Sequence, residues 1–138
     1  RTVGKAEKAL ELMVKRAGTR VAFGKPIAKL GKNLEVISRA RIEINAMRLS
    51  VLQAAKAMDV LGNKEARVYI SAVKAMVPEK ACLIVDQAIQ IHGAAGISQW
   101  TPLADMYTDM RHLRFADGPD EVHHMVVGRA ELQKYDLW

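Results

Sequence analysis

The feature that most constrains the fold is a helical pattern of unusual length in the first half of the chain. Between Ile27 and about Leu61, apolar residues recur every three or four positions along one stripe: Val36, Ala40, Ile44, Met47, Val51, Ala54, Met58 and Leu61. This spacing places them on one face of an α-helix. At about 1.5 Å per residue the helix would be roughly 50 Å long, so it needs neighbours of similar length to cover it. The sequence therefore predicts a bundle of long helices.

A second helical pattern follows the short turn at Gly62 and Asn63, which makes the two helices antiparallel neighbours. Its apolar positions are Tyr69, Val73, Met76, Val77, Ala81, Ile84, Ala88 and Ile91. The pattern closes at Gly93. Pro78 lies inside it, and we expect it to bend the helix or split it near Val77, because proline removes a backbone hydrogen bond and crowds the preceding turn.

Shorter helices complete the predicted bundle. One covers residues 3–17, another opens at 101–102 and continues to about 113, and the last begins at 119 and reaches about 134. Trp100, just before the helix that opens at 101–102, is expected to be a packing residue and not a ligand platform. Inward positions of the last helix are expected at Val122, Met125, Val126 and Ala130. The predicted fold class is all-α, an up-down four-helix bundle with long antiparallel helices.

The composition agrees with one domain over residues 1–138. Hydrophobic residues make up 50%, charged residues 26% and aromatic residues only 5%, which favours a globular bundle of helices over a sandwich of strands. No apolar run is long enough to cross a bilayer and no signal peptide is present, so we expect a soluble chain. The lone Cys82 is expected to be a small buried hydrophobe in a reducing compartment. Because the sequence starts inside a helical pattern and without an initiator Met, we expect it to be a piece of a longer protein.

The net charge of +6 is compatible with nucleic acid or an anionic cofactor. Lys and Arg are scattered along all the predicted helices, and no helix combines dense cations with exposed aromatic residues as nucleic-acid modules do. We therefore expect no nucleic-acid partner, and a solvated basic face with a few phosphate contacts.

The stretch 114–124 brings together turn-forming residues, carboxylates and a helix start. Pro119 suits the first helical position, and Asp120 and Glu121 suit the positive end of the helix dipole. Asp117 then lies just outside a helix N-terminus. It is either a surface-turn residue that accepts a backbone hydrogen bond, or a catalytic base on a tight loop where Gly118 lets a substrate approach the backbone. The residues alone leave both interpretations open.

Two other motifs are weak by themselves. Arg20 and Phe23 lie in the connector 19–26 and are either a surface charge and a packing aromatic, or ligand contacts. The turn 90–96 carries two glycines, and these are sufficiently explained as a left-handed helix cap. A bundle that serves only binding or oligomerisation fits the helices equally well, but it leaves the Asp117 loop and this turn without a purpose.

The histidines do not indicate a metal site. Glu121 and His124 form a Glu-x-x-His motif, but the chain lacks the second copy and the facing carboxylates that a di-metal bundle requires. His92 and His112 are isolated in the sequence and are expected at helix surfaces or helix ends. We therefore expect no metal.

Three separated motifs, at residues 19–27, 90–96 and 114–123, resemble in order and spacing the C-terminal domain of flavin-dependent acyl-CoA dehydrogenases. The last motif is most similar to the branch of family members 10 and 11, and the resemblance covers essentially the whole chain. It implies a longer enzyme that also has an N-terminal helical domain and a middle β domain. It further implies that this chain supplies one wall of a site for FAD and acyl-CoA and most of the subunit interface.

The resemblance also implies roles for individual residues. Asp117 corresponds to the carboxylate that takes the α-proton of the acyl thioester. Arg20 corresponds to an arginine that contacts the FAD pyrophosphate of a neighbouring subunit, and Phe23 to an aromatic beside the adenine. Contacts with the same dinucleotide are implied for Gln90, Ile91, Gly93 and Ala94, and proximity to the flavin for Glu121.

The chain departs from the usual family pattern at two places. The common Glu-Gly-Thr is here Asp117-Gly118-Pro119, which shortens the base and removes a hydroxyl contact, and Gly31 stands where many members carry a glutamine near the cofactor. The resemblance implies a homodimer or homotetramer, with electron-transfer flavoprotein as the electron acceptor. The compartment expected depends on the source: the mitochondrial matrix or peroxisome for a eukaryotic protein, and the cytoplasm for a bacterial one.

Overall fold

A computed structural model describes all 138 residues, and the chain is mostly helical. The elements in chain order are α1 (Thr2–Thr19), β1 (Val21–Ala22), β2 (Lys25–Pro26), the 3₁₀ turn η1 (Ile27–Lys29), α2 (Asn33–His92), the 3₁₀ turn η2 (Gly93–Ile97), α3 (Leu103–His112) and α4 (Asp120–Gln133). The predicted all-α class is confirmed.

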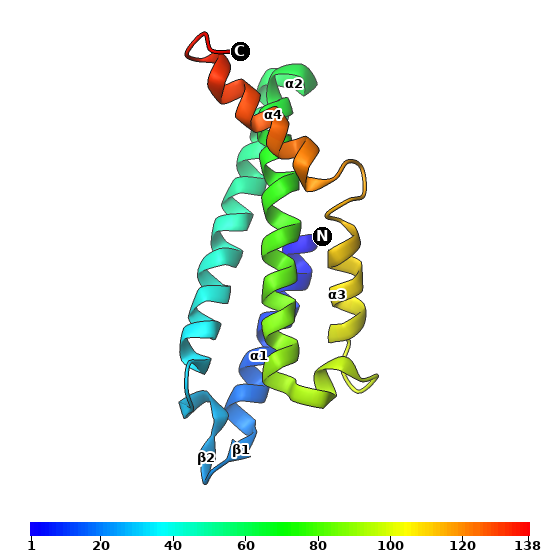
Figure 1. Cartoon of the computed structure of the whole chain (residues 1–138). Coiled ribbons are helices and arrows are strands. Elements are labelled where there is room, and N and C mark those ends of the chain that lie inside the picture. The colour runs from blue at the N-terminus through cyan, green and yellow to red at the C-terminus, as the bar shows by residue number, and fades with distance from the viewer.

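Helix α2 doubles back on itself at Gly62, where φ is 76° and ψ is 174°. Glycine adopts this backbone conformation readily because it has no Cβ. Figure 1 shows the residues before Gly62 and those after it running side by side in opposite directions. We call them the first limb (33–61) and the second limb (63–92), and Lys80 of the second donates a hydrogen bond to Glu43 of the first at 2.9 Å. The predicted antiparallel pair is confirmed.

Pro78 does not split the second limb. Gly62 is the only position inside α2 with non-helical backbone angles, and Pro78 is buried together with Val77 and Ala81. Burial of these neighbours holds the helix together in spite of the hydrogen bond that proline cannot make. Of the two expected effects of this proline, the split is therefore wrong.

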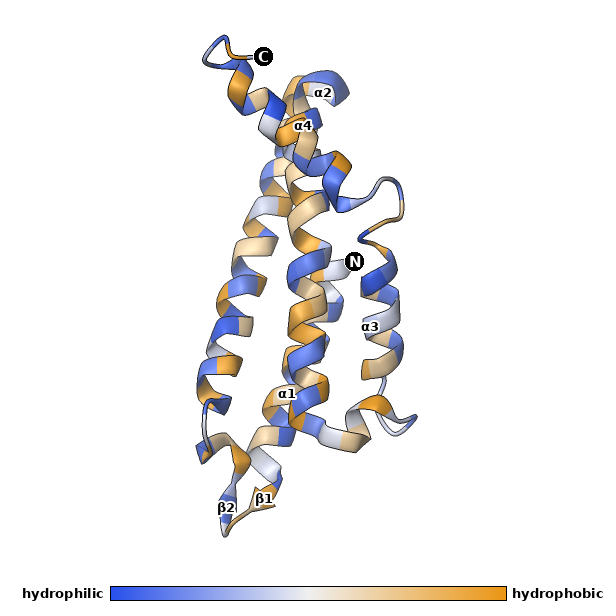
Figure 2. Ribbon diagram, viewed as in Figure 1, coloured by the Kyte–Doolittle hydropathy of each residue, from blue (hydrophilic) through white to orange (hydrophobic).

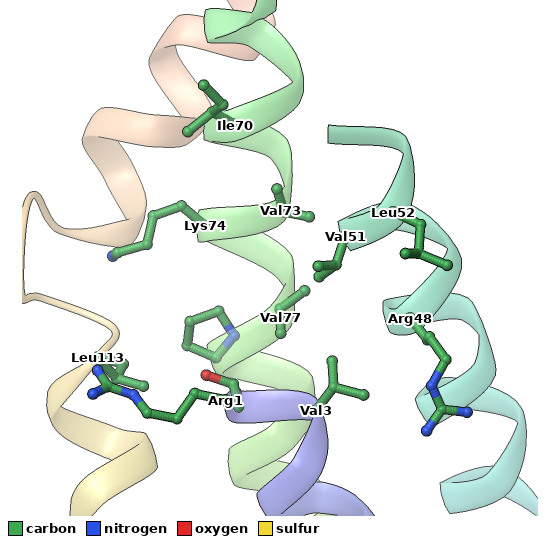
Figure 3. A pocket seen from close by; sticks show the side chains of 12 residues that line it. Arg1, Val3, Arg48, Val51, Leu52, Ile70, Val73, Lys74, Val77 and Leu113 are labelled. Atoms are coloured by element: carbon green, nitrogen blue, oxygen red, sulfur yellow. The ribbon is translucent and has the colours of Figure 1, made fainter. Parts of the chain in front are cut away.

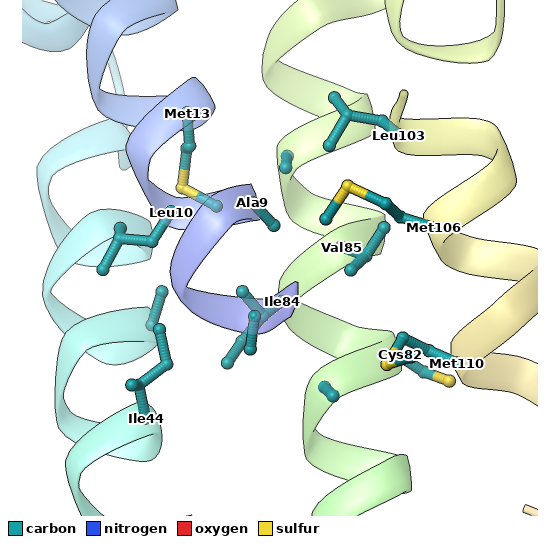
Figure 4. Packing of buried hydrophobic residues seen from close by; sticks show 14 of the residues in the cluster. Ala9, Leu10, Met13, Ile44, Cys82, Ile84, Val85, Leu103, Met106 and Met110 are labelled. Carbon is teal, nitrogen blue, oxygen red and sulfur yellow. The ribbon is translucent and has the colours of Figure 1, made fainter. Parts of the chain in front are cut away.

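The bundle alternates in direction through α1, the two limbs of α2, and α3 (Figure 1). Its core is a cluster of 16 buried residues drawn from these four helices. Figure 4 shows Met13 of α1, Ile44 of the first limb, Val85 of the second limb and Leu103 of α3 in this cluster. Each large side chain buried in this way contributes about 1.5–3 kcal/mol.

Cys82 lies in the same core and is a free, buried thiol. Burial raises the pKa of the Cys82 thiol, because an apolar environment disfavours the thiolate. Its predicted role as a small buried hydrophobe is confirmed.

The core ends where α1 and α3 end. Both are short, so the half of the α2 hairpin nearest Gly62 is covered by neither (Figure 1). Val51, Leu61 and Tyr69, expected on the buried stripes, are exposed there. Val51 and Tyr69 follow the predicted period but lack a neighbour that would cover them.

Helix α4 crosses the bundle near the Gly62 turn and packs mainly against α2. Asp120 is its only buried residue. Val122 and Met125, predicted to face inward, are exposed, while Val126 and Ala130 are half-buried. The prediction for Val122 and Met125 is wrong because a helix that crosses one partner buries only a narrow stripe.

Two connecting segments also differ from the prediction. The connector after α1 forms an antiparallel hairpin that pairs Val21 with Pro26, and α2 starts at Asn33 rather than at Ile27. The Asn33 side chain donates to the Ile27 carbonyl at 2.6 Å, which holds η1 as a separate turn before the helix. Trp100 is 82% exposed, so its predicted packing role is wrong; the loop is held instead by hydrogen bonds such as Thr101 Oγ1 to the Ala95 carbonyl, at 3.1 Å.

Candidate active site

The loop that carries Asp117 is closed at its base by two bonds between the same pair of residues. The Asp120 amide donates to the Arg114 carbonyl at 3.0 Å, and Arg114 Nε donates to Asp120 Oδ2 at 2.6 Å. Asp120 is only 8% exposed, and its hydrogen bond raises the pKa of the Arg114 guanidinium. The ends of the loop are therefore joined without any ligand.

Asp117 itself has a backbone conformation that is rare outside glycine. Its φ is 56°, and the φ of Gly118 is 103°. A non-glycine residue in this region costs on the order of 1–3 kcal/mol and persists when its surroundings hold it. Holding groups are present, because the Asp117 carbonyl lies 3.2 Å from His123 Nε2 and the Gly118 carbonyl accepts from Lys74 Nζ at 2.9 Å.

The Asp117 carboxylate is exposed and takes part in no hydrogen bond or ion pair within the chain. The turn is therefore held through backbone carbonyls and not through the carboxylate, unlike a turn in which an Asp side chain accepts a local backbone hydrogen bond. Glu121 follows on the first turn of α4 and is also exposed. The Asp117 carboxylate is therefore accessible from outside the chain, while the backbone that carries it is fixed.

An apolar groove of about 490 Å³ opens beside this loop, between the start of α1 and the two limbs of α2. Figure 3 shows Val3, Val51 and Val77 on its walls and Lys74, which bonds to Gly118, extending toward the loop. Sequence reasoning missed this groove because Val51 was assigned to the core. The difference in length between α2 and its partners is the signal that could have revealed it.

Arg20 and Phe23 lie on the hairpin at the other end of the bundle (Figure 1). Arg20 is exposed, and its guanidinium has no hydrogen-bond or ion-pair partner in the chain. Phe23 is 93% exposed and has a φ of 50° in the tight turn between the strands. The structure thus presents a free cation and a free aromatic ring on one small projection.

The turn after the second limb lies at the same end as the hairpin. Gln90, Gly93 and Ala94 are exposed and Ile91 is half-buried, and Gly93 has a φ of 64°. Gly96 has a different role, because a Cβ there would lie 2.7 Å from the Ile89 carbonyl oxygen. That glycine is therefore required for η2 to pack on α2.

The predicted site residues fall into two groups. Asp117 and Glu121 lie near one end of the bundle, whereas Arg20, Phe23 and the turn residues lie at the other (Figure 1). Lys74 touches the Asp117 loop, and the second limb runs on from it to Gln90, roughly 24 Å at 1.5 Å per residue. The structure does not bring the two groups together within one chain.

The remaining histidines have structural contacts. His92 ends α2 and is buried, and its Nδ1 donates to the Ala88 carbonyl at 2.8 Å. His112 is exposed at the end of α3, so both lie at helix ends as predicted. No group of three or more His, Cys, Asp or Glu side chains is arranged to hold a metal ion. None of the helices combines the length and the apolar character needed to cross a membrane.

The bundle matches a known family. The chain belongs to the acyl-CoA dehydrogenase family, whose C-terminal domain matches residues 1–132. The resemblance predicted from the three motifs is confirmed.

Individual relatives agree with this assignment. The chain is 49% identical over 134 residues to the probable acyl-CoA dehydrogenase FadE2 of Mycobacterium tuberculosis (strain ATCC 25618 / H37Rv), an alignment that covers 97% of this chain and 33% of that protein. It is 50% identical over 133 residues to acyl-CoA dehydrogenase family member 10 of Mus musculus, covering 96% of this chain and 12% of that protein. The structure of butyryl-CoA dehydrogenase from Megasphaera elsdenii superposes with a TM-score of 0.86 at 30% identity, covering 95% of this chain and 34% of that one. The chain therefore spans about a third or less of the relatives that it matches.

Proposed function

We propose that these residues are the C-terminal domain of a longer flavin-dependent acyl-CoA dehydrogenase, which removes hydrogen from the α and β carbons of acyl-CoA thioesters. The observation that carries the proposal is the Asp117 loop. Its carboxylate has no partner in the chain, while its backbone carbonyls are held by Lys74 and His123. Asp117 is the group that takes the α-proton.

The surroundings of the loop suit an apolar substrate. The groove beside it is lined mainly by apolar side chains and also by Arg1, Arg48 and Lys74, and its apolar walls favour an acyl chain over a polar group. An acyl chain that closes over the loop removes water from the carboxylate, and desolvation strengthens a carboxylate as a base. A fixed backbone then holds the carboxylate within reach of the α-carbon.

The exposed residues at the other end fit FAD. A dinucleotide offers phosphate oxygens to a guanidinium such as that of Arg20, and a flat ring to an aromatic such as Phe23. Gln90, Gly93 and Ala94 form a second exposed edge, next to the half-buried Ile91. When bound, FAD accepts the hydride from the β-carbon.

The distance between the two groups of residues supports an oligomer. Because Arg20 and Phe23 lie far from Asp117 within one chain, we propose that they hold the flavin of a neighbouring subunit while Asp117 serves its own. Glu121, one turn beyond Asp117, is proposed to lie near the flavin of its own subunit. Electron-transfer flavoprotein is proposed as the acceptor on the family resemblance alone.

The first limb of α2 offers the surface for such an oligomer. Large apolar side chains are exposed on the side opposite its buried stripe: Ile42, Leu49 and Val60. We call this set the outward face. With 3.6 residues per turn, these positions lie roughly opposite Ala40, Ile44 and Met47, so the limb is apolar on two sides. Helices of this kind are usually buried, and we propose a homodimer or homotetramer that covers the outward face.

The proposal is tested with the full-length protein. Under anaerobic conditions a series of acyl-CoA thioesters is added, and the flavin absorption is followed in the parent, in Asp117→Asn and in the matched control Asp136→Asn. Asp136 is also exposed and also has a positive φ, of 55°. Bleaching is expected in the parent and in Asp136→Asn, and not in Asp117→Asn.

Two other outcomes contradict the proposal in different ways. A parent that carries no flavin supports the alternative of a bundle used only for binding or oligomerisation, which the outward face would also serve. Bleaching that persists in Asp117→Asn shows that another residue is the base.

A further inference from the structure

We propose that His123 is a positioning residue for the base: it holds the Asp117 peptide in its left-handed conformation through a hydrogen-bonded relay that starts at Ser71. This inference rests on the proposed role of Asp117. His123 Nε2 lies 3.2 Å from the Asp117 carbonyl oxygen, and His123 Nδ1 lies 3.3 Å from Ser71 Oγ. The relay therefore links α2, α4 and the loop.

The chemistry of the groups determines the direction of both bonds. A carbonyl oxygen can only accept, so Nε2 must carry the hydrogen that Asp117 receives. In the neutral ring Nδ1 then accepts, and the Ser71 hydroxyl donates to it. Ser71 is buried on the second limb, which keeps its hydroxyl in place. Because both ring nitrogens are engaged, His123 is not free to act as the base itself.

The hydrogen bond from His123 acts on the peptide of Asp117, whose backbone conformation is strained. Asp117 and Gly118 both have positive φ, and their two consecutive carbonyls accept from side chains of different helices, His123 of α4 and Lys74 of α2. Rotation of Asp117 into an ordinary conformation would turn these carbonyls away from both donors. The two bonds together oppose that rotation.

The neighbouring glycine shows how closely His123 approaches the loop. A Cβ on Gly118 would lie 3.0 Å from His123 Nε2, tighter than an ordinary contact. Gly118 is therefore suited to this position both by its φ and by the ring packed against it.

An aspartate base makes the backbone more important than a glutamate would. The Asp side chain has one methylene fewer, so fewer bonds can rotate to correct a misplaced backbone. The position of the Asp117 peptide thus sets the position of the carboxylate, and a misplacement of about 1 Å is enough to cost up to 100-fold in rate. His123 acts on catalysis through this peptide and does not touch the reacting atoms.

The test separates positioning from substrate binding in the full-length protein. Stopped-flow measurements give the limiting rate of flavin bleaching and the apparent thioester dissociation constant for His123→Leu, His123→Gln and the neighbouring control His124→Leu. His123→Leu is expected to lower the limiting rate about 10- to 100-fold and to leave the dissociation constant within about twofold. His123→Gln restores most of the rate because its amide nitrogen can donate to the same carbonyl, and His124→Leu, on an exposed side chain, behaves as the parent.

Other results overturn the inference. A parent-like rate in His123→Leu would show that His123 does not position the base. An equal loss of rate in His123→Gln and His123→Leu would show that His123 acts through packing and not through its hydrogen bond. If His123→Leu does not fold, Ser71→Ala and His123→Gln provide the test instead. Ser71→Ala is expected to lower the limiting rate without loss of flavin, and a parent-like rate in Ser71→Ala would count against the relay. Asp117→Asn in the same series separates the two proposals: bleaching in that variant refutes the base, whereas a silent Asp117→Asn beside a parent-like His123→Leu refutes only the relay.

Discussion

Asp117 combines a strained backbone with an unpaired carboxylate, and Arg20 combines an exposed position with an unpaired guanidinium. Neither charged group has a hydrogen bond or an ion pair within the chain, so these interactions do not explain its presence. Both therefore suit the roles proposed for them, toward the acyl thioester in one case and the flavin phosphates in the other.

Replacing Arg20 by alanine should weaken flavin retention in the assembled enzyme. Hydrogen bonds to a charged group contribute about 1.5–3 kcal/mol, so retention should fall roughly tenfold or more. The measurement is the ratio of flavin to protein after dialysis, with Lys25→Ala on the second strand of the same hairpin as the control. Full flavin occupancy in Arg20→Ala would show that Arg20 does not help to bind the flavin.

The contact between α1 and the first limb includes a carboxylate shared by two arginines. Glu7 accepts from Arg41 and from Arg48, at 2.5 Å and 3.0 Å. The hydrogen bond from Arg41, assisted by Arg48, holds the pKa of Glu7 below its ordinary value of 4.5. Glu7 is 38% exposed at its side chain, so solvent screens the pair and we expect it to contribute less than about 1 kcal/mol.

This lowered pKa fixes the sign of a pH effect. The stabilisation is fully present above the unfolded carboxyl value and is lost as the pH falls through the lowered folded value. Glu7→Gln should therefore be less stable than the parent near neutral pH, and the difference should shrink in acid below 4.5. Urea unfolding of the parent and of Glu7→Gln, near neutral pH and in acid, measures the difference in stability, with the exposed Glu65→Gln as control. A stability difference that widens in acid would contradict this prediction.

The reversal of α2 depends on Gly62. Because its φ of 76° and ψ of 174° lie in a region that is nearly restricted to glycine, Gly62→Ala should destabilise the chain by about 1–3 kcal/mol. Gly128 lies inside α4 with open space around its Cα, so Gly128→Ala should be neutral or stabilising by up to about 1 kcal/mol. Thermal unfolding of both variants tests this pair, and equal effects from the two substitutions would show that the backbone angle at Gly62 is not the cause.

The long helices could be predicted from the sequence because apolar period and helix stops are local signals. Gly62, Gly93 and Pro119 mark boundaries that the structure reproduces within a few residues. The buried faces of α4 and of the half of the α2 hairpin nearest Gly62 could not be predicted, because burial there depends on which helix lies opposite. The β1–β2 hairpin was missed since strands of two residues are too short to show a period.

The candidate site divides in the same way. The turn and helix-start residues around Asp117 mark its loop, but they leave its role open, and the role of base comes from the family resemblance. The groups that hold the loop could not be predicted, because Lys74 is 44 positions from Gly118 and Ser71 is 52 positions from His123. Contacts over such distances arise only when the second limb, α4 and the loop are folded together.

The outward face of the first limb should determine the assembly. Ile42→Asp combined with Leu49→Asp places two charges among its exposed apolar side chains, and desolvating a charge at an interface is costly. We expect the oligomer to dissociate into single chains in sedimentation experiments, with Thr108→Asp on α3, at an exposed position, as the control. An unchanged oligomer in the double variant would place the interface elsewhere.

Asp117 is proposed to take the α-proton, and proton exchange tests this role without requiring oxidation. The full-length protein is incubated in heavy water with an acyl-CoA analogue that cannot lose its β-hydrogen, and mass spectrometry follows deuterium at the α-carbon. We expect rapid incorporation with the parent and with Asp136→Asn, and incorporation with Asp117→Asn no faster than in buffer. Undiminished exchange in Asp117→Asn would contradict it and assign the base to another residue.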